Sequence, residues 1–135
     1  MSKLLERLRD PVRSGVYRVA RGDAIDEVMH DAAHIDLKGG DALRAIAQAL
    51  RFPDWFGGNW DALEDCLGDL SWRQGDGHVL VFRNWQALGS DELGVLIDVL
   101  RSTAEFWSGR GRPFFAVLID PENKLTLPAL HRERA

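Results

Sequence analysis

Acidic side chains are concentrated in one part of the sequence. The acids between residues 54 and 76 are Asp54, Asp61, Glu64, Asp65, Asp69 and Asp76. Arg73 alone opposes them, so this segment has a formal charge of −5, whereas the whole chain carries −4. Carboxylates held at fixed spacing attract a basic partner and can take the place of nucleic-acid phosphates in a basic cleft. The segment is therefore a candidate site for binding another protein.

The pattern of residues 59–70 predicts a helix that would display these acids. Its apolar residues recur at spacings of three and four: Trp60, Leu63, Cys66, Leu67 and Leu70. Such a stripe faces inward, which leaves Asp61, Glu64 and Asp65 on one exposed patch. Asp69 follows one turn further on, and no lysine or arginine within the helix offsets the repulsion. Two interpretations stay open: a solvated helix face, or a surface that binds a cationic partner.

Other groups of reactive side chains are poor candidates for a catalytic or metal site. His30 and His34 are four apart, but no third zinc ligand accompanies them. Ser71, Asp76 and His78 are close in sequence, yet they lack the tight turn that exposes a catalytic nucleophile. We therefore expect no enzyme activity, no cofactor and no metal.

Size and composition indicate one globular domain. Of the 135 residues, 45% are hydrophobic and 28% charged, and the only cysteine, Cys66, rules out an intramolecular disulfide. No stretch reaches the roughly 18 uninterrupted apolar residues of a membrane span. Residues 1–11 are too charged for a secretory signal, so we expect a cytoplasmic protein that is monomeric when free. The net charge of −4 disfavours direct binding to nucleic acid.

Strand-like and helix-like patterns alternate along the chain and predict an α/β fold. The predicted strands are Val16–Val19, His34–Leu37, Val79–Phe82 and Phe114–Ile119. The predicted helices span 24–32, 41–50, 59–70 and 91–108, with Asp23, Asp41, Asn59 and Asp91 as their caps. Helices between successive strands imply a small parallel sheet of three core strands packed with helices. The Val16–Val19 segment adds an N-terminal edge strand.

The two ends of the chain are predicted to lie outside the central unit. The first eleven residues place three leucines at helical spacing before a proline, which indicates a short helix or a loosely held arm. We interpret residues 1–31 as an N-terminal extension and residues 32–120 as the domain itself. Residues 121–135 are rich in prolines and charges, so we expect them to form a flexible tail.

A motif within Leu50–Leu67 resembles the signature of the barstar family. The signature has a proline, an acid, two aromatics, a glycine, any residue and an asparagine, and then an Asp-Ala-Leu helix with a second aspartate and Cys-Leu. In this chain it reads Pro53-Asp54-Trp55-Phe56-Gly57-Gly58-Asn59-Trp60-Asp61-Ala62-Leu63-Glu64-Asp65-Cys66-Leu67. The order of strands and helices around the motif also follows the family. The resemblance covers about residues 33–119.

The resemblance implies an intracellular inhibitor of a basic, barnase-like ribonuclease or a related toxin. Family members block guanyl-specific secreted ribonucleases by plugging the active site with an acidic helix and the loop before it. Asp65 matches the acid that enters the enzyme's phosphate pocket, and Asp61 matches a second acid. Trp55 matches an aromatic that packs on the enzyme, and we expect both it and Phe56 to be exposed. The implied partner-binding residues are Asp54, Trp55, Phe56, Gly57, Gly58, Asn59, Asp61, Glu64, Asp65 and Asp69.

Two positions depart from the family's prototype. Glu64 stands where the prototype has an exposed tryptophan. Near Ser102 a further contacting glutamate is not reproduced, although Glu105 lies one turn away. A second function therefore stays open beside ribonuclease inhibition: a non-inhibitory interaction module of the same fold that binds another basic protein.

Overall fold

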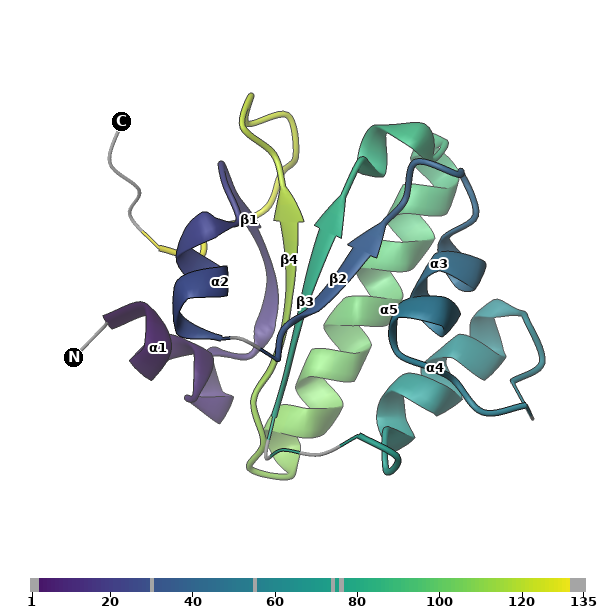
Figure 1. Ribbon diagram of the computed structural model, residues 1–135, viewed down its shortest axis with the longest axis horizontal. Helices are drawn as coiled ribbons and strands as arrows, with labels where there is room; N and C mark the ends of the chain where they lie inside the picture. The colour runs from purple at the N-terminus through teal and green to yellow at the C-terminus, as the bar shows by residue number, and fades with distance from the viewer. Residues whose placement is uncertain (1–2, 30, 55, 74, 76, 132–135) are drawn as a thin grey trace.

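The computed structural model describes residues 3–29, 31–54, 56–73, 75 and 77–131. The strands are β1 (Gly15–Val19), β2 (Ala33–Asp36), β3 (His78–Arg83) and β4 (Phe114–Ile119). The helices are α1 (Lys3–Leu8), α2 (Asp23–Val28), α3 (Ala42–Ala49), α4 (Trp60–Asp69) and α5 (Ser90–Gly109), with short 3₁₀ turns η1 (Pro11–Arg13) and η2 (Trp85–Ala87). The four strands form one parallel sheet in the order β1-β4-β3-β2 (Figure 1). This confirms the predicted α/β fold, with β1 as the N-terminal edge strand.

The two central strands supply both faces of the sheet with apolar side chains. In β3, Leu80 and Phe82 belong to one hydrophobic core and Val79 and Val81 to the other. The same alternation runs along β4, because successive side chains of a strand point to opposite faces. The continuous apolar runs in both segments are therefore explained by burial on both faces, as predicted.

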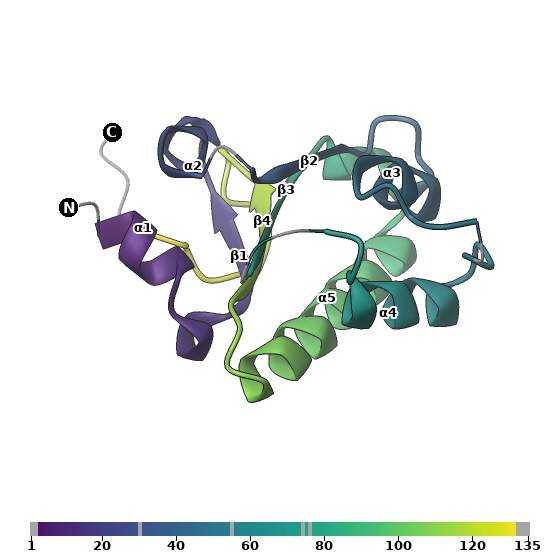
Figure 2. The ribbon, with the colours of Figure 1, turned by 60° about the horizontal axis from the view of Figure 1, so that its bottom comes forward.

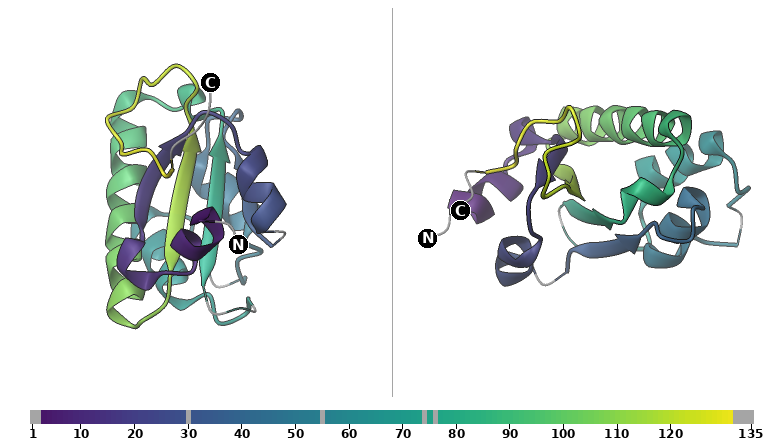
Figure 3. Two further views of the ribbon diagram at one scale, coloured as in Figure 1. Left: turned by 90° about the vertical axis from the view of Figure 1, so that its left-hand side faces the viewer. Right: turned by 90° about the horizontal axis from the view of Figure 1, so that it is seen from above.

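Helices α3, α4 and α5 cover one face of the sheet, and α2 lies on the other (Figure 3). The larger core joins Ile46 of α3, Leu63 of α4 and Leu100 of α5 to Phe82 and the neighbouring strand residues. Figure 2 shows α4 lying beside α5. Within the described residues no helix is both long and apolar enough to cross a bilayer.

The smaller core uses residues from both ends of the chain. Leu8 of α1 and Ile25 of α2 pack with Phe115 of β4, and Leu130 is completely buried there. Helix α1 is thus a packed element rather than a loosely held arm. Strand β1 pairs with β4, so the segment interpreted as an extension also contributes to the sheet.

The segment after β4 folds back onto the sheet instead of extending as a tail. Both Asp120 carboxylate oxygens accept backbone N–H groups, from Lys124 at 3.0 Å and from Leu125 at 2.8 Å. The backbone N–H of Leu130 donates to the carbonyl of Arg18 in β1 at 3.0 Å. Residues 121–131 are therefore held by hydrogen bonds and burial, and residues 132–135 lie outside the described residues.

The predicted caps are right for two helices and wrong for two. Asp41 and Asn59 accept backbone N–H groups from the first turns of α3 and α4. Asp91, the predicted cap of α5, lies inside its first turn. The helix starts earlier, because Gly89, whose backbone is extended, is its cap residue. An acid inside the first turn still interacts favourably with the helix dipole. An aspartate therefore suits either place, the cap or the first turn. Asp23 likewise lies inside α2, after Gly22.

Replacing Leu8 with alanine tests whether α1 is an integral part of the fold. Leu8 is 1% exposed, so Leu8→Ala should lower the free energy of unfolding by about 2 to 5 kcal/mol in urea titrations. Val12→Ala is the matched control in the same segment, because Val12 is 84% exposed and should change stability by less than about 0.5 kcal/mol. Equal and small effects of both substitutions would mean that α1 is detached in solution.

His78 should make stability depend on pH. Its ring is buried against Trp107 and Phe114, and burial, followed by the charges of Arg73 and Arg112, lowers its pKa from 6.5 to about 4. As the pH falls below 6.5 the unfolded chain takes up this proton first, so stability is lost between pH 6.5 and 4.

The matched variant for this test is His78→Phe, which keeps an apolar ring and removes the titrating group. Over that pH range the wild-type free energy of unfolding should fall by up to about 3 kcal/mol more than that of the variant. Parallel curves for the two proteins would contradict a neutral, buried His78.

Candidate functional site

Helix α4 begins at a side-chain cap. The backbone of Asn59 is extended, with φ −127° and ψ 173°, and its Oδ1 accepts the N–H of Ala62 at 2.7 Å. Gly58 precedes it with φ +73°, a conformation that glycine adopts without strain. Leu70 ends the helix in the left-handed region, and its N–H donates to the carbonyl of Cys66 at 3.1 Å. Local sequence thus fixes both ends of α4.

Tertiary contacts fix how α4 is rotated. Its predicted inward stripe is buried from Leu63 to Leu70, with Leu63, Cys66 and Leu67 fully inaccessible to solvent, whereas Trp60 is half-buried. The indole N–H of Trp107 in α5 donates to the carbonyl of Leu67 at 2.8 Å. After the helix, Trp72 donates in the same way to the carbonyl of Leu50 at the end of α3, at 2.9 Å. Two indoles therefore tie α4 and the segment after it to the neighbouring helices.

The acids of α4 point outward. Asp61, Glu64, Asp65 and Asp69 are all exposed, as the helical pattern predicted. None of the ion pairs found among the described residues involves any of them. Asp69 alone has a hydrogen bond there, accepting the N–H of Ser71 at 3.3 Å. Three neighbouring carboxylates are thus left to solvent or to a partner.

Two carboxylates of α4, Asp65 and Asp69, act on a thiol of the same helix. Burial raises the pKa of Cys66, and the charges of Asp65 and Asp69 raise it further. A thiolate there would be desolvated and would face two negative groups. Cys66 is therefore a neutral packing residue beneath the acidic face, as its place on the apolar stripe predicted.

The loop before α4 is anchored by aromatic packing. Asp54, Gly57, Gly58 and Asn59 are exposed, as expected for residues that a partner would contact. The expectation of an exposed Phe56 is wrong: its ring is half-buried and meets the ring of Phe52 edge-on at 4.9 Å. The predicted contact Trp55 lies outside the described residues.

A shallow groove of about 420 Å³ runs between α4 and α5 beside the acids. Glu64, Asp65 and Gly68 line one wall, and the other is lined by Ser102, Thr103 and Phe106. Phe106 is 41% exposed, and the guanidinium of Arg110 lies over its ring, 4.5 Å from the centroid.

No sequence pattern predicted that Phe106 would line a groove. Phe106 falls beside the buried stripe of a long helix, and its place in a groove becomes evident only when the position of the neighbouring helix is known. Glu105, noted one turn from Ser102, does not line the groove.

The other candidate sites of the sequence analysis have structural explanations. His34 Nε2 lies 3.0 Å from a carboxylate oxygen of Asp26, and Nδ1 lies 2.7 Å from the guanidinium of Arg83. His30 and Asp76 are outside the described residues. Over the described ranges no group of three or more histidine, cysteine or acidic side chains is placed to hold a metal ion.

Comparison with known families identifies the same region. The family model described as Barstar (barnase inhibitor) matches residues 34–119, which contain β2, α3, α4, β3, α5 and β4. A comparison with curated proteins finds no match. The matched residues include the capped acidic helix, its preceding loop and the groove beside them. The chain belongs to the barstar family.

Proposed function

We propose that this chain inhibits a barnase-type ribonuclease by placing the carboxylates of α4 in the enzyme's active site. The observation that carries this proposal is the set of exposed carboxylates Asp61, Glu64 and Asp65, which form no ion pair with any described residue, on a helix of fixed rotation. A cleft that binds RNA presents cationic side chains to phosphates, and carboxylates at suitable spacing satisfy the same cations. Family membership supports the proposal, because barstar-family proteins are inhibitors and not enzymes.

The free inhibitor holds its acids in an unfavourable arrangement that binding would relieve. Like charges three or four residues apart on a helix repel each other by a few tenths of a kcal/mol per pair. A cationic cleft removes this repulsion and adds direct attraction. Because Asn59 caps the helix and its inner side is buried, little backbone ordering accompanies binding.

We assign the central contact to Asp65 and a supporting contact to Asp61, as the family pattern implies. The loop contributes open backbone: a Cβ added at Gly58 would meet no atom of the described residues within 4 Å, so a partner surface has room to approach there. The proposed contact set is Asp54, Trp55, Phe56, Gly57, Gly58, Asn59, Asp61, Glu64, Asp65 and Asp69. Phe56 contributes through the exposed part of a ring that mainly anchors the loop.

The departures at Glu64 and Ser102 bear on which ribonuclease is bound. Both residues line the groove between α4 and α5, where Glu64 adds a charge and Ser102 presents no carboxylate. We infer a target whose cationic surface extends over Glu64. As family membership implies, we place this action in the cytoplasm, with the inhibitor monomeric when free and binding the nuclease without a cofactor or metal.

Inhibition assays against a panel of small, basic, secreted ribonucleases test the proposal. Stoichiometric loss of RNA cleavage with at least one of them is the expected result. A pull-down from the producing cells provides the second measurement. Capture of a basic protein without nuclease activity, together with no inhibition across the panel, would favour the non-inhibitory interaction module instead.

Substituting Asp65 should weaken the complex mainly through faster dissociation. Asp65→Ala leaves a desolvated cation on the enzyme without its partner, which costs about 2 to 5 kcal/mol of binding free energy. Surface plasmon resonance separates the two rate constants. Glu27→Ala is the control, because Glu27 is an exposed acid on α2, across the sheet from α4 (Figure 3). A dissociation rate equal to that of the control would reject the central role of Asp65.

Substituting Asp69 should affect association more than dissociation. Asp69 lies at the end of the acidic face, where a charge steers the encounter without being desolvated. Asp69→Asn should slow association at low salt, and the difference should shrink near 0.15 M, where the screening length is about 8 Å. An effect that is independent of ionic strength, or one matched by Glu27→Gln, would contradict steering.

A further inference from the structure

A group of arginines lies around the amino ends of β3 and β4, near the carboxyl end of α4 at Asp69. Arg73 comes from the segment after α4, and Arg110 and Arg112 come from the turn between α5 and β4. All three line one hollow of about 680 Å³, together with His78 and Trp107.

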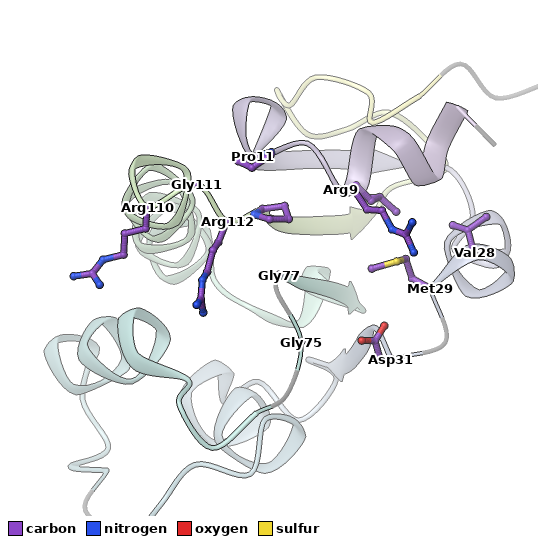
Figure 4. A pocket seen from close by; sticks show the side chains of 12 residues that line it. Arg9, Pro11, Val28, Met29, Asp31, Gly75, Gly77, Arg110, Gly111 and Arg112 are labelled. Atoms are coloured by element: carbon purple, nitrogen blue, oxygen red, sulfur yellow. The ribbon is translucent and has the colours of Figure 1, made fainter. Parts of the chain in front are cut away.

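A second hollow, of about 900 Å³, adjoins the first and shares Arg110, Arg112 and Gly75 with it. Figure 4 shows this second hollow, with Arg112 and Arg9 entering from different segments of the chain. Guanidinium groups from Arg9 just after α1, from the α4–β3 segment and from the α5–β4 turn therefore border two adjoining hollows.

In the part of the chain that the structure describes, no carboxylate forms an ion pair with any of the three arginines of the smaller hollow. Arg110 and Arg112 instead lie over aromatic rings, 4.5 Å from the centroid of Phe106 and 5.9 Å from that of Trp107. The Nε of Arg73 is shielded from solvent and has no hydrogen-bond acceptor among the described residues. A buried donor normally has a hydrogen-bond acceptor, so an acceptor supplied by a bound ligand would fit this position.

The local charge favours an anion. Arg73 and Arg112 lie near enough to His78 to help lower its pKa, after the larger effect of burial, so the ring is neutral at pH 7. Two described carboxylates stand against the arginines. Asp69 lines the hollow, and its Oδ1 accepts the N–H of Ser71; Asp31 lines the adjoining hollow, and its charge acts to raise the pKa of His78. Guanidinium groups offer paired N–H donors that match the oxygens of a phosphate.

We propose that the hollow bounded by Arg73, Arg110 and Arg112 binds a phosphate dianion, free or as a monoester. A tetrahedral phosphate has enough oxygens to accept from three separate guanidinium groups, whereas a carboxylate has two. The volume of about 680 Å³ leaves room for the organic group of an ester. A long polyanion fits less well, because the chain carries −4 and the acidic face of α4 adjoins the hollow at Gly68 and Asp69.

Nuclear magnetic resonance titrations at constant ionic strength test this site. The probes are inorganic phosphate, glycerol phosphate, adenosine 5′-monophosphate and a short single-stranded RNA, with chloride as the reference anion. We expect saturable shifts of the arginine Nε–H signals and of the Trp107 indole with phosphate or its esters. Equal affinities assign free phosphate as the ligand, and tighter binding of one ester assigns the monoester.

Arg112→Gln and Arg110→Gln should each weaken phosphate binding about tenfold or more, as expected for the loss of a charge-assisted hydrogen bond. Arg44→Gln on α3 is the matched control and should bind normally, because Arg44 is exposed and lines neither hollow. Circular dichroism confirms that each variant folds. Unsaturable shifts, the same response to chloride, binding of RNA alone, or equal affinities for the arginine variants and the control would each overturn the proposal.

Discussion

The direction of the α4 carboxylates is set by burial of the opposite side of the same helix. Leu63 and Leu67 belong to the larger core, Cys66 is fully buried beside them in the helix, and the indole N–H of Trp107 donates to the carbonyl of Leu67. A shift by one residue would rotate α4 by about 100° and carry charged groups toward the core, at a cost of several kcal/mol. The electrostatic surface is therefore a consequence of core packing. A substitution that loosens this packing would also make the spacing of the α4 carboxylates less well defined.

The cores on the two faces of the sheet differ in how many of their residues lie within the range matched by the family model. The larger core, which supports α4, comes mainly from the matched residues 34–119. The smaller core takes Leu4, Leu8, Ile25 and Leu130 from outside that range. Residues near both ends of the chain therefore complete the core on the sheet face opposite α4. They support the acidic face indirectly, because they enclose the apolar side chains of β3 and β4 that face away from α4.

Features determined by local sequence could be predicted from the sequence. The continuous apolar run Phe114–Ile119 gives the bounds of β4, and the Asn59 cap needs contacts within one turn only. Features that depend on distant partners could not. Leu130 lies among prolines and charges without periodicity, and its burial follows from pairing beside β1. Phe56 lies in a loop beside the exposed Gly57 and Gly58, yet it packs against Phe52.

The same distinction holds for the candidate site. The outward direction of Asp61 and Asp65 follows from helical periodicity, whereas the groove and the part played by Phe106 follow from how α5 lies against α4. The arginine hollow brings together Arg73 and Arg110, which lie more than thirty residues apart in the sequence, so no sequence pattern predicted it.

Competition with an active-site ligand tests the central claim most directly. The apparent Kd of the inhibitor for its ribonuclease is measured with increasing amounts of a mononucleotide that occupies the enzyme's phosphate-binding site. If the α4 carboxylates occupy that site, the apparent Kd rises linearly with the concentration of free nucleotide and reaches no plateau, because the two cannot bind together. An apparent Kd that stays constant at saturating nucleotide would place the inhibitor elsewhere on the enzyme and contradict phosphate mimicry.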